Sequence, residues 1–176
     1  MARTAPVEAS RVVGDGLTAA YMNSNVRDAV NFLATPPIAR MRASGTQSIG
    51  NTTWTAINFD ITDFDTDSGH SNVTNNSRYT AQVKGYYRIT GTVAYAVNFV
   101  PIASYAINGS RAAAGSRVGG GTNLSTTSTA DIEDIIHLSV NDYVELMTIQ
   151  NSGVAAATAF SGDFGCSFSV QWLYSG

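Results

Sequence analysis

Apolar and polar side chains alternate most strictly between residues 86 and 95. One face of this stretch carries Tyr87, Ile89, Val93 and Tyr95, and the other carries Tyr86, Arg88, Thr90 and Thr92. Strict alternation predicts a β-strand whose two faces meet different surroundings. The second face holds one tyrosine and two threonines around one arginine, so it is neither an apolar interior nor a typical charged surface. We expect it to contact a neighbouring copy of the chain.

The same period of two recurs through most of the chain after residue 37. Short strands are predicted near residues 38–43, 46–50, 53–60, 78–84, 86–97, 103–108, 111–118, 128–139, 142–150 and 165–174. Turn signals such as Ser44-Gly45 and Asn141-Asp142 separate them. Many short strands with no helix between them favour one all-β domain over residues 38–176, an antiparallel sandwich or jelly roll.

Residues 1–37 form a different unit, an arm followed by one amphipathic helix. Residues 1–16 are small and polar, which predicts an extended arm held by another chain. The helix begins after Thr18, an N-cap residue type, and ends before Pro36 and Pro37. Its apolar stripe and flank comprise Leu17, Tyr21, Met22, Val26, Val30 and Leu33. Two interpretations stay open: the stripe packs on its own domain, or it docks on a partner or on symmetry-related copies.

Composition excludes several classes of protein. Charged residues make up 13% of the 176, about half the usual share, and the net charge is −3. The ten basic residues are scattered, so the chain has no electrostatic footprint for nucleic acid. It has no apolar run that could cross a membrane and no signal-peptide core, so we expect synthesis in a cytoplasm. Cys166 is the only cysteine and lies in an apolar strand pattern, which is typical of a small buried hydrophobe.

The acidic stretch around Asp63, Asp65 and Asp67 is the strongest candidate for chemistry. Alternating aspartates place carboxylate oxygens on one side of a loop, as a calcium site requires. An EF-hand that starts at Asp63 needs glycine at its sixth position and glutamate at its twelfth, where this chain has Ser68 and Thr74. The alternative, which we favour, is a loop of turn-capping aspartates. We therefore expect no cofactor, and calcium stays the alternative.

Other candidates for chemistry are weaker. His70 is expected to hold the acidic loop together, and His137 is expected to have a hydrogen-bonded structural role in a strand. The run from Gly119 to Thr122 lacks the lysine of a P-loop and predicts a flexible loop. Because a nucleophile elbow of the GxSxG type is also missing, we assign no catalytic residue and expect a non-enzymatic protein.

Four segments, taken in order, carry a resemblance to a known family. They are FDTDSGHSNVTNNSRYT (64–80), GYYRITGTVAY (85–95), the turn NGS (108–110) and IIHLSVNDYVELMTIQNSG (135–153) with the closing strand CSFSVQWLY (166–174). Together they resemble the globular head of the complement recognition protein, within the tumour-necrosis-factor (TNF)-like jelly rolls, in the version typical of bacteriophage virion proteins. The opening LTAAYMNSNVRDAVNFL (17–33) is similar to the start of actinobacteriophage minor tail or head-surface proteins.

The resemblance implies a ten-strand jelly roll that forms a homotrimer, with an inner sheet facing the three-fold axis. It implies that the strands at 86–95, 142–150 and 165–174 all belong to this inner sheet. Val144 and Leu146 would then point into the sandwich. The trimer contacts expected on this basis are Tyr86, Arg88, Tyr143, Met147, Trp172 and Tyr174.

The function expected from this resemblance is structural. The trimer would be a component of the virion surface, made in the host cytoplasm, and we expect it to be a capsid decoration protein. Its helix and arm would bind the major capsid or tail protein. The alternative is a minor tail or spike adhesin whose loops, near 62–77 and 119–128, bind a host-surface glycan or protein.

Overall fold

The computed structural model describes residues 5–6, 12–97, 99–111, 118–124, 127–161 and 164–176. Its centre is a ten-stranded antiparallel sheet folded into two layers. One layer, the β6 layer, contains β4 (Ile61–Asp65), β1 (Ile38–Arg42), β14 (Ser167–Tyr174), β6 (Gly85–Tyr95) and β9 (Thr127–Leu138), in that order. The prediction of an antiparallel β-sandwich behind one N-terminal helix is confirmed.

The second layer, the β10 layer, is built around β10 (Tyr143–Ile149). This strand pairs with β7 (Ile102–Ile107) on one side and with β3 (Thr55–Ala56) and β5 (Arg78–Thr80) on the other. The strand β8 (Val118–Leu124) pairs with both β7 and β9, so it joins the two layers. Two small pairs complete the fold, β2 (Ser48–Ile49) with β11 (Ala156–Ala157) and β12 (Phe160–Ser161) with β13 (Phe164–Gly165).

The core lies between the two layers and follows the predicted alternation. Tyr87, Ile89, Val93 and Tyr95 of β6 are buried, as are Val144 and Leu146 of β10. A Cβ atom on Gly91 would lie 2.6 Å from Cδ1 of Leu146, so glycine here permits β6 to approach β10 closely. The Tyr95 hydroxyl lies 3.1 Å from Thr148 Oγ1, and burial raises the pKa of Tyr95 to about 12.

The assignment of residues 142–150 to the same inner layer as 86–95 is wrong. The strand β10 belongs to the opposite layer, where its ladder partners are β7, β3 and β5. Its alternation was interpreted correctly, because Val144 and Leu146 do face the core. Alternation shows which side chains of a strand turn inward, but it does not show which strands are its neighbours.

Two predicted loops are strands. The acidic stretch includes β4, which pairs with β1 at the edge of the β6 layer. The glycine run lies in β8, where a Cβ atom on Gly119 would lie 1.9 Å from the carbonyl oxygen of Asp131. Glycine is therefore needed for β8 to pass close to β9, rather than for a flexible loop. Most of the strand predicted at 111–118 lies outside the described residues.

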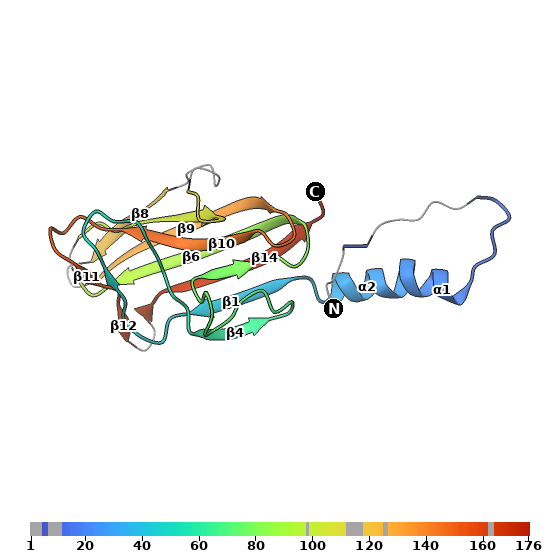
Figure 1. Cartoon of the computed structure of the whole chain (residues 1–176), viewed down its shortest axis with the longest axis horizontal. Helices are drawn as coiled ribbons and strands as arrows, with labels where there is room; N and C mark the ends of the chain where they lie inside the picture. The colour runs from blue at the N-terminus through green and yellow to red at the C-terminus, as the bar shows by residue number, and fades with distance from the viewer. Residues whose placement is uncertain (1–4, 7–11, 98, 112–117, 125–126, 162–163) are drawn as a thin grey trace.

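The N-terminal helical segment comprises α1 (Ala19–Met22), a π-helical turn η1 (Asn23–Arg27) and α2 (Asp28–Ala34). Thr18 is the N-cap, as predicted, and its hydroxyl accepts a hydrogen bond of 3.2 Å from the backbone N–H of Tyr21. Figure 1 shows the helix projecting from the end of the sandwich where the C-terminus lies. Within the described part of the chain, no helix is long and apolar enough to span a membrane.

Candidate functional site

Four strands of the β6 layer present one continuous outward surface, which we call the β6 face. Residues directly opposite one another in an antiparallel ladder project from the same face, so the register defines this surface. Its cross-strand rows are Arg42–Ser167–Thr92–Asp131, Arg40–Ser169–Thr90–Glu133, Ile38–Gln171–Arg88–Ile135 and Tyr174–Tyr86–His137.

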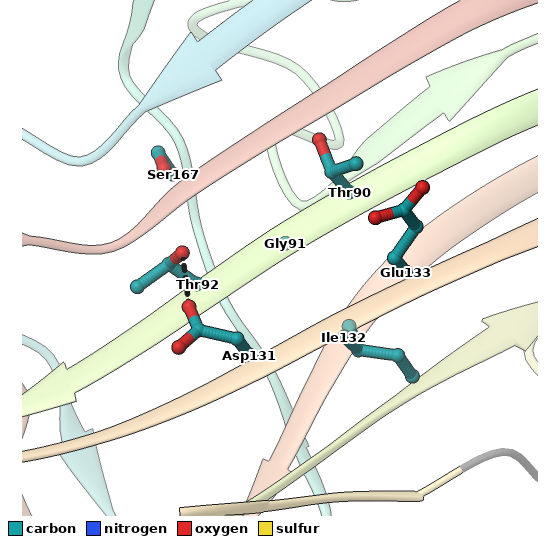
Figure 2. Close-up of a pocket in the computed structure, with 7 residues that line it drawn as sticks. All are labelled: Thr90, Gly91, Thr92, Asp131, Ile132, Glu133 and Ser167. Carbon is teal, nitrogen blue, oxygen red and sulfur yellow. Dashed lines mark hydrogen bonds between the residues drawn. The ribbon is translucent and has the colours of Figure 1, made fainter. Parts of the chain in front are cut away.

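A shallow hollow of about 310 Å³ lies on the β6 face, over β6 and β9. Figure 2 shows Thr90, Thr92 and Ser167 along it, with Asp131 and Glu133 on one side. The Thr92 hydroxyl donates a 2.6 Å hydrogen bond to Asp131 Oδ1. Because serine and threonine side chains are short, the middle of the face is lower than its charged flanks.

Charged groups occupy the two flanks of the hollow. On β1, the Nε atoms of Arg40 and Arg42 lie 3.6 Å and 2.8 Å from the two carboxylate oxygens of Asp63. On the far side, Glu133 of β9 forms an ion pair with Arg88 of β6. The side chains of Arg40, Arg42, Arg88 and Glu133 are each about half exposed. Because these ion pairs are solvated, they contribute little to the stability of one subunit.

An aromatic cluster forms the end of the β6 face nearest the helix. The rings of Tyr86 and Tyr174 are stacked with centroids 4.8 Å apart, and the His137 ring lies edge-on to Tyr86 at 5.2 Å. His137 was expected to have a hydrogen-bonded structural role, but its side chain is exposed on this face and contacts Tyr86. Tyrosine is a residue type enriched in protein interfaces.

The six residues predicted for the trimer contact do not lie on one surface. Tyr86, Arg88 and Tyr174 are on the β6 face. Tyr143 and Met147 are on the outward face of the opposite layer, because they alternate with the buried Val144 and Leu146.

Trp172 is buried, and its indole N–H donates a 3.2 Å hydrogen bond to the carbonyl of Lys84. Trp172 and Tyr174 were both predicted as trimer contacts, but an irregularity in the register between them leaves Trp172 in the core and turns Tyr174 outward. Sequence alternation alone could not show this irregularity.

The acidic loop is held by specific hydrogen bonds. Asp65 accepts hydrogen bonds from the backbone N–H groups of Asp67 (3.1 Å) and His70 (2.8 Å). The two ring nitrogens of His70 lie 2.9 Å from the Arg78 carbonyl oxygen and 3.1 Å from that of Phe59. His70 therefore ties the loop to the neighbouring backbone, as expected.

Asp63, the third calcium candidate with Asp65 and Asp67, is engaged with Arg40 and Arg42 instead. Among the residues that the structure describes, no three His, Cys, Asp or Glu side chains are grouped so that they could hold a metal ion.

Cys166 is buried, as expected, and burial raises the pKa of its thiol.

The helix exposes most of its apolar stripe. Leu17, Met22, Val26, Val30 and Leu33 are all exposed, with Leu33 at 68% and Val30 at 58%, and Tyr21 is half-buried. A groove of about 530 Å³ is lined by one side of the helix together with Ala5, Pro6 and Trp172. The first of the two interpretations, in which the whole stripe packs on its own domain, therefore does not hold for the single chain.

One helix residue missed by the sequence analysis anchors the helix to the sandwich. Phe32 is only 5% exposed, and its ring packs edge-on against Trp172 with centroids 4.9 Å apart. Phe32 is the last aromatic residue before the double proline, which could have indicated a contact at the junction.

Ile135 on the β6 face was also missed by the sequence analysis, although the outward alternation of Asp131, Glu133, Ile135 and His137 was readable in the sequence.

Comparison with known proteins establishes the fold alone. No protein-family model and no curated protein sequence matches the chain. The globular domain of the zebrafish complement 1qA protein is similar, with a TM-score of 0.56 and 10% identity over 80% of this chain and 99% of that domain. Murine APRIL has a TM-score of 0.54 and 11% identity over 77% of this chain and 98% of that chain.

The Eiger TNF of S. frugiperda is similar as well, with a TM-score of 0.53 and 10% identity over 80% of this chain and 95% of that chain. The chain therefore has a C1q/TNF-like jelly-roll fold, as predicted.

Proposed function

We propose that this chain is a structural protein of a bacteriophage virion. A trimeric jelly roll is anchored on the particle by its N-terminal arm and helix, most simply as a capsid decoration protein. The observation that carries the proposal is the helix, which extends beyond the sandwich with its apolar stripe in solvent. An exposed apolar stripe of this kind is typical of a segment that binds another protein.

Trimerisation is supported by the fold and by the β6 face. C1q/TNF-like domains commonly form trimers. Three large hydrophobic side chains of the β6 layer, Phe64, Ile135 and Tyr174, are exposed on its outward side, with Ile135 at 55%. On the outward side of the opposite layer, Glu145 is buried and Tyr143 and Met147 are half-buried. The β6 face is therefore the surface that we assign to the three-fold contact.

The helix is suited to an apolar groove on a capsid or tail subunit. Met22, Val26 and Val30 recur at intervals of four residues and are all exposed. An amphipathic helix that lies in a groove presents anchors with this kind of spacing. Three helices on one trimer raise the effective concentration of each, so that weak individual contacts become firm attachment.

The test uses the full chain with two lysines on the stripe, Val26→Lys and Val30→Lys. The matched control places the same charges on the polar side of the helix, Asn23→Lys and Asn31→Lys. Each tagged variant is supplied to particles assembled without the protein, and the copies per particle are counted after density-gradient sedimentation. We expect folded trimers from both, with incorporation lost only for the stripe variant. Equal incorporation of both variants would refute helix-mediated attachment.

Adhesion to a host-surface glycan or protein is a second candidate function. It is favoured by the loop between β4 and β5, in which Val73 is strongly exposed while Asp65 and His70 fix the backbone. A rigid exposed loop binds with a small cost in conformational entropy. If Val73→Asp abolishes binding of the isolated trimer to host cells while incorporation into particles is unchanged, the protein is an adhesin. If Val73→Asp leaves cell binding unchanged, or if the wild-type trimer does not bind host cells, this function is refuted.

A further inference from the structure

The β6 face carries opposite charges on its two sides. Arg40 and Arg42 of β1 form a basic column, and Asp131 and Glu133 of β9 form an acidic column. The register aligns them, because Arg42 shares a cross-strand row with Asp131, and Arg40 shares the next row with Glu133. The strands β14 and β6 lie between the two columns and contribute only serine and threonine to these rows.

The two columns cannot neutralise each other within one subunit. They are separated by three strand spacings, or roughly 14 Å, which is more than a Debye length at physiological salt. Each column has a local counter-ion, Asp63 for the arginines and Arg88 for Glu133. Counted over the residues that the structure describes, two guanidinium groups with one carboxylate leave a positive charge on one flank, and two carboxylates with one guanidinium leave a negative charge on the other. Each flank therefore keeps a net charge that another molecule could complement.

We propose that the β6 face binds a second copy of this chain by placing the basic column of one copy against the acidic column of the next. This inference rests on the proposed trimer and specifies how its subunits dock. A contact between two different patches of the same subunit is heterologous, and such contacts close into a ring when the rotation between copies permits. Complementary charges of this kind fix orientation and exclude incorrect pairings.

The low centre of the face fits this arrangement. Ser167, Ser169, Thr90 and Thr92 leave room for a partner's side chains and offer hydroxyl groups to arginine or carboxylate ends. The exposed Phe64 and Ile135 lie at opposite sides of the same face and supply apolar contact beside each charged column. Charge would then set the register of the copies, while apolar burial would supply most of the affinity.

Charge reversal in the full-length protein tests the pairing. The single variants are Arg42→Glu and Asp131→Arg, and the double variant combines them. A second row, Arg40→Glu with Glu133→Arg, repeats the experiment in case one set fails to fold, and Lys84→Glu is the control because Lys84 is exposed and lies outside the four rows. Dissociation is followed by sedimentation velocity across protein concentrations, at about 0.15 M and about 1 M salt.

We expect each single reversal to raise the concentration of half-dissociation by at least about tenfold at the lower salt, since like charges then face each other. The double variant should return to within about threefold of wild type, because the pairing is restored with its polarity exchanged. Lys84→Glu should have no effect.

The outcomes separate this inference from the proposed trimer. If wild type is a trimer and the single reversals leave its dissociation unchanged, the charge pairing is refuted and the trimer stands. If the double variant is as weak as the singles, the pairing is likewise refuted. If wild type is a monomer over the whole concentration range, the proposed trimer fails and the pairing fails with it.

Discussion

Substituting Phe32 by alanine should release the helix from the jelly roll. Phe32 is the buried residue of the helical segment, and its ring contacts Trp172 at the junction. Removing a well-buried phenylalanine costs about 3–5 kcal/mol in a closed core. The groove beside Phe32 is open, so the lower end of this range applies, at about 3 kcal/mol.

The loss should appear in the helix rather than in the sandwich. A helix of about four turns is marginal in water without tertiary contacts, so a detached segment will fray. A loss of about 3 kcal/mol corresponds to roughly a 100-fold fall in amide protection. Hydrogen exchange followed by mass spectrometry should therefore show faster exchange over Asp28–Ala34, with protection in β6 and β14 retained.

The matched control is Val30→Ala, which truncates an exposed side chain on the same helix. Its expected effect on exchange is small, because it removes no buried contact and alanine is a strong helix former. Unchanged protection of the α2 amides in Phe32→Ala would show that the contact with Trp172 does not hold the helix. Equal loss in both variants would show that truncating an exposed side chain has the same effect, so that the buried contact of Phe32 is not what holds the segment.

Three further predictions concern the sandwich. Gly119→Ala should destabilise the domain by about 1–3 kcal/mol in chemical denaturation, because the added Cβ would overlap the Asp131 carbonyl. The control is Gly45→Ala, where the added Cβ meets open space, and this change should be nearly neutral or stabilising. Tyr86→Asp should dissociate the proposed trimer in light scattering while Met147→Asp should not, and the reverse result would contradict the assignment of the β6 face. Hydrogen bonds from the Asn108 side chain and the Ser139 backbone lower the pKa of Asp142, so its contribution to stability is present above about pH 4 and lost as pH falls through the lowered pKa. Asp142→Asn should therefore flatten the acid limb of the stability profile, and an unchanged limb would refute the role of these hydrogen bonds.

Local patterns in the sequence determined the fold class and much of the burial. The alternation in β6 identified its buried face, and Thr18 and the double proline fixed the ends of the helix. Both signals depend on neighbours only a few residues away, through a strand period of two and through capping of backbone N–H groups. The outward orientation of Tyr86 and Arg88 on the β6 face was predicted in the same way, by alternation alone.

Only the tertiary structure decided which strands are neighbours. It placed β10 in the opposite layer, turned Tyr174 away from the side of Trp172, and aligned Arg42, Ser167, Thr92 and Asp131 in one row. These residues are far apart in the sequence, and their alignment follows from backbone hydrogen bonds between distant strands. A period of two fixes the orientation of a side chain within its own strand, but the identity of the adjacent strand depends on how the whole chain closes around its core.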